Sequence, residues 1–183
     1  MDTKKEIRLK NKKIRQGLDI QSISKRIAKN LFDSEEYIKA QNIFTYISKK
    51  SEISTEQILN DKNKNIFVPK ITDNEMFFTK YDKTNLVKNK FGIYETTDNK
   101  SFVPKKNDVI IIPALAADLN FYRTGYGGGF YDKFLKNNNG IKIILLPEIL
   151  LCENLPHESH DVSADMIITE NRLIRNNSLL LRQ

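Results

Sequence analysis

The chain has 183 residues, a formal net charge of +7 and a mean hydropathy of -0.50, with 39% hydrophobic and 29% charged residues. This length suits a single compact domain over residues 1–183, and no apolar run approaches the roughly 20 residues of a membrane-spanning helix. The N-terminus lacks the apolar segment of a secretory signal, and one cysteine, Cys152, excludes an internal disulfide framework, so we expect a cytoplasmic protein without membrane association.

The first segment is predicted to be a basic helix. Thr3, with Glu6 three residues later, matches the capping box that starts many helices. Residues 1–15 carry seven basic and two acidic side chains, and helical spacing places Lys4 and Arg8 one turn apart on the same face. Such a pair is commonly a solvated basic face, but it also suits an anionic ligand.

Helices and strands are predicted to alternate along the rest of the chain. A second helix is expected at about residues 22–37, capped by Asp19, and a short one at residues 54–59. Strands are expected at residues 42–47, 66–69, 76–81, 108–113, 141–146 and 166–169. We expect Pro69 to end its strand, and the continuous apolar run 108–113 favours a central parallel strand. These elements predict an α/β fold, a three-layer αβα sandwich with a mainly parallel, Rossmann-like central sheet.

A glycine-rich segment follows the strand at residues 108–113 and precedes a predicted helix. Its glycines and the charged residues beside them are Arg123, Gly125, Gly127, Gly128, Gly129 and Asp132. Glycines let the backbone approach a phosphate closely, and the N-terminus of the following helix adds a partial positive charge. A carboxylate beside a phosphate is best explained by a metal ion between them. The segment therefore predicts a phosphate site with a metal ion, although glycines can also simply form a tight turn.

The glycine-rich segment matches neither of two common phosphate-binding motifs. No Gly-Lys-Ser/Thr follows, so it is not a Walker A loop, and Phe130 stands where the dinucleotide fingerprint has its third glycine. A zinc site is not expected, because no structural zinc pattern fits the spacing of Cys152, His157, His160 and Asp161. We expect no nucleic-acid partner, because exposed aromatic residues are not interleaved with the basic residues of the first helix.

Two segments, DVIIIPALAAD at 108–118 and NFYRTGYGGGFYDKFL at 120–135, resemble the signature of the 5-formyltetrahydrofolate cyclo-ligase family, also called methenyltetrahydrofolate synthetases. Weaker matches occur in order along nearly the whole chain, at Lys4-x-x-x-Arg8, residues 44–47 with Glu52, residues 91–95 and residues 155–161. The chain departs from the family pattern at Ala114, Ala117 and Phe130. The last change removes a tyrosine hydroxyl, and none of the three alters a charged position.

The resemblance implies an enzyme that converts 5-formyltetrahydrofolate to 5,10-methenyltetrahydrofolate, with hydrolysis of ATP to ADP and phosphate. Phosphorylation turns the formyl oxygen into a good leaving group, so that N10 can attack the formyl carbon. Such an enzyme must neutralise the triphosphate, align the γ-phosphorus with the formyl oxygen and exclude water. We expect Mg²⁺ as cofactor, ATP as co-substrate, a reduced folate as the other small-molecule substrate, and a monomer.

The resemblance also assigns residues to each ligand. The ATP-binding positions are Lys4, Arg8, Arg123, Thr124, Gly125, Tyr126, Gly127, Gly128, Gly129, Phe130 and Tyr131. The folate-binding positions are Ile47, Glu52, Tyr126, Gly127, Gly128, Gly129 and Phe130. Arg123 and Tyr126 are the expected catalytic residues, at the place where the two substrates meet. Asp132 and Asp161 are expected to bind Mg²⁺, which commonly takes one or two carboxylates together with phosphate oxygens and water.

In the folate site, Glu52 would accept paired hydrogen bonds from the pterin and Ile47 would form an apolar wall. Other positions also have plain structural explanations. Three aromatic residues are candidates for stacking on folate, although core packing explains them better: Tyr46, Phe78 and Phe91. Asp132 would also suit the dipole of the helix that it begins, and Asp161 would also suit a loop cap.

Two other functions remain open on the sequence. A phosphate-ligand binder of the same fold, such as a sugar-phosphate-binding protein, would keep the glycine-rich segment but would not need Glu52 or the second aspartate. An RNA-binding accessory domain would depend on the basic first helix.

Overall fold

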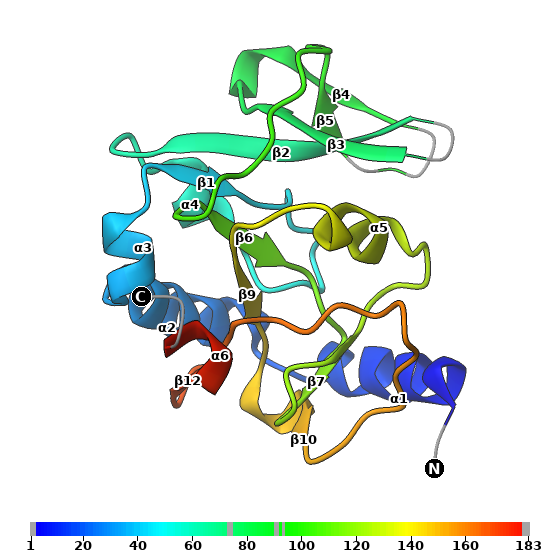
Figure 1. Cartoon of the computed structure of the whole chain (residues 1–183). Coiled ribbons are helices and arrows are strands. Elements are labelled where there is room, and N and C mark those ends of the chain that lie inside the picture. The colour runs from blue at the N-terminus through cyan, green and yellow to red at the C-terminus, as the bar shows by residue number, and fades with distance from the viewer. Residues whose placement is uncertain (1–2, 73–74, 90–91, 93, 181–183) are drawn as a thin grey trace.

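A large sheet runs through the protein, whose computed structural model describes residues 3–72, 75–89, 92 and 94–180 (Figure 1). In chain order its strands are β1 (Asn42–Phe44), β2 (Asn65–Thr72), β3 (Glu75–Lys80), β6 (Val109–Ile112), β9 (Ile141–Leu145), β11 (Met166–Ile168) and β12 (Leu173–Arg175). They lie side by side in the order β12-β11-β9-β6-β1-β2-β3. The neighbours from β11 to β2 are parallel, and the edge strands β12 and β3 are antiparallel to theirs.

Two small sheets accompany the large one. The hairpin of β4 (Leu86–Lys88) and β5 (Tyr94–Thr96) lies close to β2 and β3, at the top of Figure 1. The other sheet has the order β10-β7-β8 and contains β7 (Ala116–Asp118), β8 (Arg123–Thr124) and β10 (Leu151–Cys152). The sequence predicted neither, because strands of two or three residues are too short to show a period.

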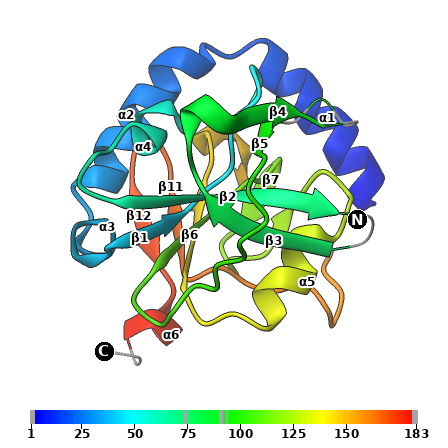
Figure 2. The ribbon, with the colours of Figure 1, turned by 90° about the horizontal axis from the view of Figure 1, so that it is seen from above.

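Helices cover both faces of the large sheet. They are α1 (Lys4–Gln16), α2 (Ile20–Phe32), α3 (Glu35–Lys39), α4 (Glu56–Leu59), α5 (Phe130–Lys136) and α6 (Asn177–Leu180), with 3-10 turns at Lys83–Asn85 and Glu148–Leu150. Helices α2 and α5 lie on opposite sides of the sheet (Figure 2). Within the described part of the chain, no helix is long and apolar enough to cross a membrane.

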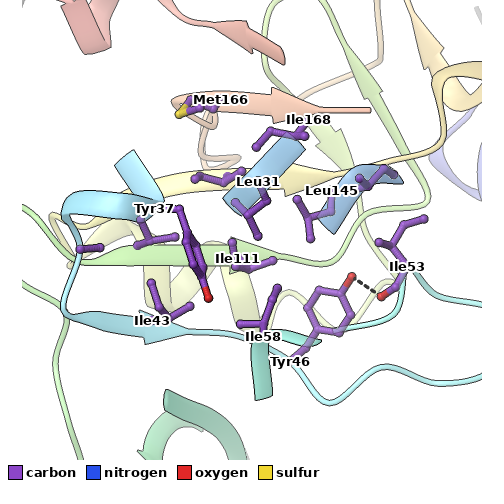
Figure 3. Close-up of a cluster of buried hydrophobic side chains, with 14 of the residues drawn as sticks. Leu31, Tyr37, Ile43, Tyr46, Ile53, Ile58, Ile111, Leu145, Met166 and Ile168 are labelled. Atoms are coloured by element: carbon purple, nitrogen blue, oxygen red, sulfur yellow. Dashed lines mark hydrogen bonds between the residues drawn. The ribbon is translucent and has the colours of Figure 1, made fainter. Parts of the chain in front are cut away.

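The two hydrophobic cores follow from the alternation of side chains along the strands. In β6, Val109 and Ile111 pack into the core under α2, whereas Ile110 and Ile112 pack into the core under α5. Figure 3 shows the first of these cores, with Leu31 of α2 in the same cluster as Ile111. All four β6 side chains are buried, which confirms the predicted central strand. The cores on both faces and the parallel pairs from β11 to β2 confirm the three-layer αβα arrangement and the mainly parallel, Rossmann-like sheet.

The order of the strands reverses once inside the parallel part of the sheet. From β1 the chain moves outward to β2 and β3, and from β6 it moves the other way to β9 and β11. The reversal therefore lies between β1 and β6. In open α/β sheets, the carboxyl ends of the strands at such a point leave a crevice where ligands bind.

The first helix begins as predicted, but the second predicted helix is two helices. Thr3 and Glu6 form the capping box, with the Thr3 N–H donating to Glu6 Oε2 at 2.7 Å. Asp19 caps α2 by accepting from the N–H of Ser22 at 3.0 Å, as expected. The single helix expected over residues 22–37 is wrong: Ser34 Oγ donates to Leu31 O and accepts from Tyr37 N. The Ser34 side chain thus ends α2 and caps α3.

The structure also corrects the lengths of two strands. The predicted strand at 42–47 ends at Phe44, and Pro69 lies inside β2 instead of ending it. Thr45 N–H donates to Phe67 O at 2.8 Å, and the next N–H on this edge of β2 would belong to residue 69. Because proline has no N–H, the pairing of β1 with β2 stops there, while β2 continues along β3 as far as Thr72.

Candidate active site

A cavity of about 770 Å³ lies at the carboxyl ends of β1 and β6, where the strand order reverses. Ile47, just beyond β1, and Pro113, directly after β6, both line it. Its volume is typical of small-molecule sites, which span roughly 300–1,000 Å³. All fifteen residues assigned to ligands from the sequence line this cavity: Lys4, Arg8, Ile47, Glu52, Arg123, Thr124, Gly125, Tyr126, Gly127, Gly128, Gly129, Phe130, Tyr131, Asp132 and Asp161.

Helix α1 presents Lys4 and Arg8 to the cavity. Arg8 Nε donates to Gly125 O at 3.0 Å, and its guanidinium carbon lies 3.5 Å from the position that a Cβ on Gly127 would occupy. Lys4 Nζ lies 2.6 Å from Asp161 Oδ2 and 3.2 Å from Glu158 Oε1. Both cations therefore contact the segments that carry the predicted phosphate and metal positions, although α1 is distant from them in the sequence.

The Lys4–Asp161 pair keeps both groups charged. Burial by itself lowers the pKa of Lys4 and raises the pKa of Asp161. For Lys4, the hydrogen bonds and negative charges of Asp161 and Glu158 together outweigh burial, so its pKa is raised. For Asp161, the hydrogen bonds from Lys4 and the Glu158 N–H, together with nearby positive charge, outweigh burial, so its pKa is lowered. Asp161 also accepts from the N–H of Glu158 at 2.7 Å, so the loop-cap explanation holds alongside any ligand role.

Arg123 reaches the cavity from β8, and Asp118 builds the turn that precedes it. Asp118 Oδ1 accepts from the N–H groups of Asn120 and Tyr122, at 3.0 and 2.9 Å. The Arg123 side chain is only 4% exposed, and its Nη2 lies 3.1 Å from Asp132 Oδ1. The short strand that was missed from the sequence thus fixes the cation beside the glycine-rich segment.

Asp132 and Asp161 come together through one backbone segment. Asp132 lies in the first turn of α5, and its Oδ1 accepts from the N–H of Val162, the neighbour of Asp161, at 3.3 Å. No group of three or more His, Cys, Asp and Glu side chains in the described ranges is arranged to hold a metal ion. Two carboxylates on one cavity wall fit Mg²⁺ if ligand oxygens and water complete its coordination.

The glycine-rich segment contains two positions where the backbone itself requires glycine. Gly127 has φ = 104° and Gly129, the N-cap of α5, has φ = 67°. A tight turn explains these two glycines. It does not explain Gly125, whose φ is not positive and whose Cβ would meet nothing within 4 Å. Gly125 leaves open space beside a cavity that it lines.

Three buried polar atoms of cavity-lining side chains lack a hydrogen-bond partner among the described residues. They are Arg123 Nε, Thr124 Oγ1 and the Tyr131 hydroxyl. An unpaired buried polar atom costs about 1–3 kcal/mol, so native proteins rarely keep one without a reason. These atoms fit donors and acceptors that a polar ligand would satisfy.

Three tyrosines surround Glu52 at another part of the cavity. Burial raises the pKa of Tyr46, Tyr126 and Tyr131, and the Glu52 carboxylate raises each of them further. Glu52 Oε2 accepts from the N–H of Lys49 at 2.7 Å. The arrangement is a carboxylate that a backbone N–H fixes beside the Tyr126 hydroxyl, in the same cavity as the apolar Ile47, and it suits a planar ligand that carries N–H groups.

The three aromatic residues considered for stacking on folate lie in different surroundings. Tyr46 lines the cavity, but it is 6% exposed and its hydroxyl donates to Ile53 O in the first core (Figure 3). Phe78 is fully buried in the second core and does not line the cavity. Core packing thus explains Phe78, as expected, and Phe91 lies outside the described residues.

The sequence interpretation missed Arg15, a buried arginine of α1 next to this site. It is 3% exposed and donates hydrogen bonds to Ser51 O, Ala114 O and the Tyr126 hydroxyl. It also missed basic residues that line the cavity, Lys49, Lys133 and Lys136. The two lysines of α5 carried a signal, since they follow the glycine-rich segment at helical spacing.

Comparisons with known proteins show the family to which the chain belongs. The family model described as the 5-formyltetrahydrofolate cyclo-ligase family matches residues 1–170. A 5-formyltetrahydrofolate cyclo-ligase of Haemophilus influenzae is 32% identical over 179 residues, which cover 88% of this chain and 96% of the relative.

Solved structures give the same result for the fold. The NMR structure of Aquifex aeolicus 5,10-methenyltetrahydrofolate synthetase superposes with a TM-score of 0.84 and 29% identity, covering 94% of this chain and 92% of that one. The Mycoplasma pneumoniae 5,10-methenyltetrahydrofolate synthetase shares the fold, with a TM-score of 0.71 and 23% identity over 93% of this chain and 99% of that one. The chain belongs to the 5-formyltetrahydrofolate cyclo-ligase family.

Proposed function

We propose that the protein converts 5-formyltetrahydrofolate to 5,10-methenyltetrahydrofolate and hydrolyses ATP to ADP and phosphate with Mg²⁺. One observation carries this proposal beyond family membership. A single cavity joins a glycine-rich, cation-flanked segment to the carboxylate of Glu52 among its tyrosines, and Tyr126 belongs to both parts. Two ligands of different chemistry can therefore meet at Tyr126.

The triphosphate would lie along the glycine-rich segment. Lys4 and Arg8 approach it from α1, and Arg123 approaches it from β8. The backbone of residues 124–131 offers N–H groups, and the unpaired Thr124 Oγ1 offers a further hydrogen bond. Arg123, almost fully buried, supplies a fixed positive charge where negative charge builds up on the transferred phosphoryl group.

The aspartates Asp132 and Asp161 would hold the metal ion against the phosphates. A Mg²⁺ ion there would neutralise charge on the β- and γ-phosphate oxygens. The two carboxylates would supply negative charge and two oxygen ligands to the metal ion. The hydrogen bond from the Val162 N–H links Asp132 to the segment that carries Asp161.

The folate would occupy the part of the cavity around Glu52 and Ile47. Glu52 would accept hydrogen bonds from the pterin, and Ile47 would cover one ring face. The tyrosine hydroxyls nearby stay protonated at neutral pH, because burial and Glu52 raise the pKa of each. Tyr126 can then donate a hydrogen bond where the two substrates meet.

The chemistry proceeds in two balanced steps. The formyl oxygen attacks the γ-phosphorus, and the bond to ADP breaks with its electrons going to the ADP oxygen. N10 then attacks the formyl carbon and loses its proton, and phosphate leaves with the former formyl oxygen. The protein contributes alignment of the reacting atoms and stabilisation of the transferred charge.

The direct test is the appearance of methenyltetrahydrofolate absorbance when purified protein is mixed with MgATP and 5-formyltetrahydrofolate. We expect product that depends on both ATP and Mg²⁺, and we expect the folded Asp132→Ala variant to lose turnover. A folded wild-type protein that produces no methenyl absorbance would contradict the proposed function. Binding of sugar phosphates without folate binding would favour the phosphate-ligand binder.

A further inference from the structure

We propose that Arg15 is a positioning residue that fixes Tyr126 and the Glu52 segment and thereby sets the affinity for the folate. The inference rests on the proposed function, because it assigns the folate to the Glu52 part of the cavity. Arg15 itself does not line the cavity, so it acts through its neighbours.

The three hydrogen bonds of Arg15 join segments that the chain keeps far apart. Its Nη1 donates to Ser51 O at 3.2 Å and to the Tyr126 hydroxyl at 3.5 Å, and its Nη2 donates to Ala114 O. Ser51 is the neighbour of Glu52, Ala114 follows the central strand β6, and Tyr126 belongs to the glycine-rich segment. One guanidinium group thus connects helix α1 to both ligand regions.

The contact with Tyr126 also decides the direction of its hydroxyl. A phenol has one proton to donate, and an arginine can only donate. When Arg15 donates to the hydroxyl oxygen, the phenol proton is free to point to Glu52, which lies within hydrogen-bonding reach of Tyr126. The chain Arg15 to Tyr126 to Glu52 therefore acts together with the N–H of Lys49 in orienting the carboxylate.

The burial of Arg15 indicates a role beyond packing. Arg15 is 3% exposed and makes no ion pair with a described residue, although a buried charge normally has a charged partner. Its contacts are two backbone carbonyls and one phenol, and its Nε has no partner among the described residues. Packing alone would be served by an apolar side chain, whereas the fork of a guanidinium group reaches several acceptors at once.

The test is Arg15→Lys, which keeps the charge but replaces the fork with a single ammonium group. We expect the Kd of 5-formyltetrahydrofolate, measured by calorimetry, and its KM to rise about tenfold, while the Kd of MgATP changes by less than about twofold. Equal losses for both ligands, or an unchanged folate Kd, would overturn the inference.

The matched control is Arg175→Lys. Arg175 also uses its fork, donating to the buried Glu36 at 2.7 and 3.0 Å in a partly buried pair, and neither residue lines the cavity. We expect this variant to lower the Tm without changing the folate Kd. If Arg175→Lys weakens folate binding as much as Arg15→Lys does, the effect is general destabilisation and the inference fails.

Tyr126→Phe tests the same link and keeps Arg15 with its two backbone acceptors, so it is informative even if the Arg15 variant does not fold. We expect it to raise the folate Kd, and we expect the double variant to bind folate about as weakly as the weaker single variant, because both break one link. Losses that add fully would overturn the inference. A wild-type protein that binds no folate would instead overturn the proposed function on which the inference rests.

Discussion

Lys4 Nζ lies 2.6 Å from Asp161 Oδ2, so a cation proposed for ATP pairs with a carboxylate proposed for Mg²⁺. Arg123 and Asp132 repeat this arrangement at 3.1 Å. The two kinds of charge therefore neutralise each other in this structure. In the proposed function, MgATP would exchange both sets of partners at once, with phosphates taking the cations and the metal taking the carboxylates. ATP without metal would leave the carboxylates facing phosphate.

Asp161→Asn is expected to change the affinities for metal-free ATP and for MgATP in opposite directions. Removing one negative charge should strengthen the binding of metal-free ATP about fivefold, because Lys4 is released and repulsion falls. The same change should weaken the binding of MgATP. Calorimetry with ATP in excess EDTA, and then with Mg²⁺, measures both constants.

The matched control for this variant is Glu158→Gln. Glu158 also contacts Lys4, but its side chain is 61% exposed, so both constants should change by less than about twofold. If Asp161→Asn weakens the two forms of ATP equally, the exchange of partners is wrong.

Two alanine substitutions in the glycine-rich segment should behave differently. Gly127→Ala places a side chain at φ = 104° and against Arg8, so we expect it to lower the free energy of unfolding by about 1–3 kcal/mol. Gly125→Ala meets no atom within 4 Å, so the Tm should stay nearly unchanged while MgATP binds more weakly. Thermal unfolding and calorimetry together test this. A Gly125→Ala variant with normal MgATP affinity would show that the phosphates do not approach this residue.

Tyr131→Phe should stabilise the free protein and weaken its binding of MgATP. The Tyr131 hydroxyl is buried without a partner among the described residues, so removing it should raise the free energy of unfolding by about 1 kcal/mol. Tyr131 lies near Arg123 as well as near Glu52, so MgATP affinity should fall about five- to tenfold, because the nucleotide loses a hydrogen bond. Thr45→Val is the control, since Thr45 Oγ1 is also buried, likewise has no partner among the described residues, and does not line the cavity. It should stabilise the protein and leave MgATP affinity unchanged; a parallel loss of affinity would contradict the assignment.

The Glu36–Arg175 pair should give the protein an acid-dependent stability. Burial by itself raises the pKa of Glu36, but the hydrogen bonds from Arg175 and from the backbone, together with the positive charges of Arg175 and Lys39, outweigh burial and hold the pKa below its ordinary value of 4.5. A lowered folded-state pKa means that the stabilisation is present above pH 4.5 and is lost as the pH falls through the folded-state pKa.

Glu36→Gln should therefore lower the free energy of unfolding by about 2 kcal/mol near neutral pH, as measured by urea denaturation. The difference between the wild type and the variant should shrink below pH 4.5. A difference that is the same at about pH 3.5 and at about pH 7 would contradict this account.

Much of the fold and of the candidate site could be predicted from local sequence patterns. The apolar run of β6, the capping box at Thr3 and the glycines before α5 each depend on neighbours in the chain, so their structures could be predicted. The two errors in element boundaries also have local causes, but the spacing of hydrophobic residues does not reveal them. Ser34 divides one apparent helix into two, and Pro69 blocks pairing on only one edge of β2.

The sequence by itself determined the fold class and, through its family resemblance, the residues of the candidate site. Only the tertiary structure decided how those residues combine, because their contacts span the whole chain. Lys4 meets Asp161 across 157 positions, and Arg15 meets Tyr126 across 111. In the sequence Arg15 is one basic residue among seven in a helix, and only folding shows that it is the buried one. Charge and periodicity are local properties, whereas burial and pairing follow from the order of the strands.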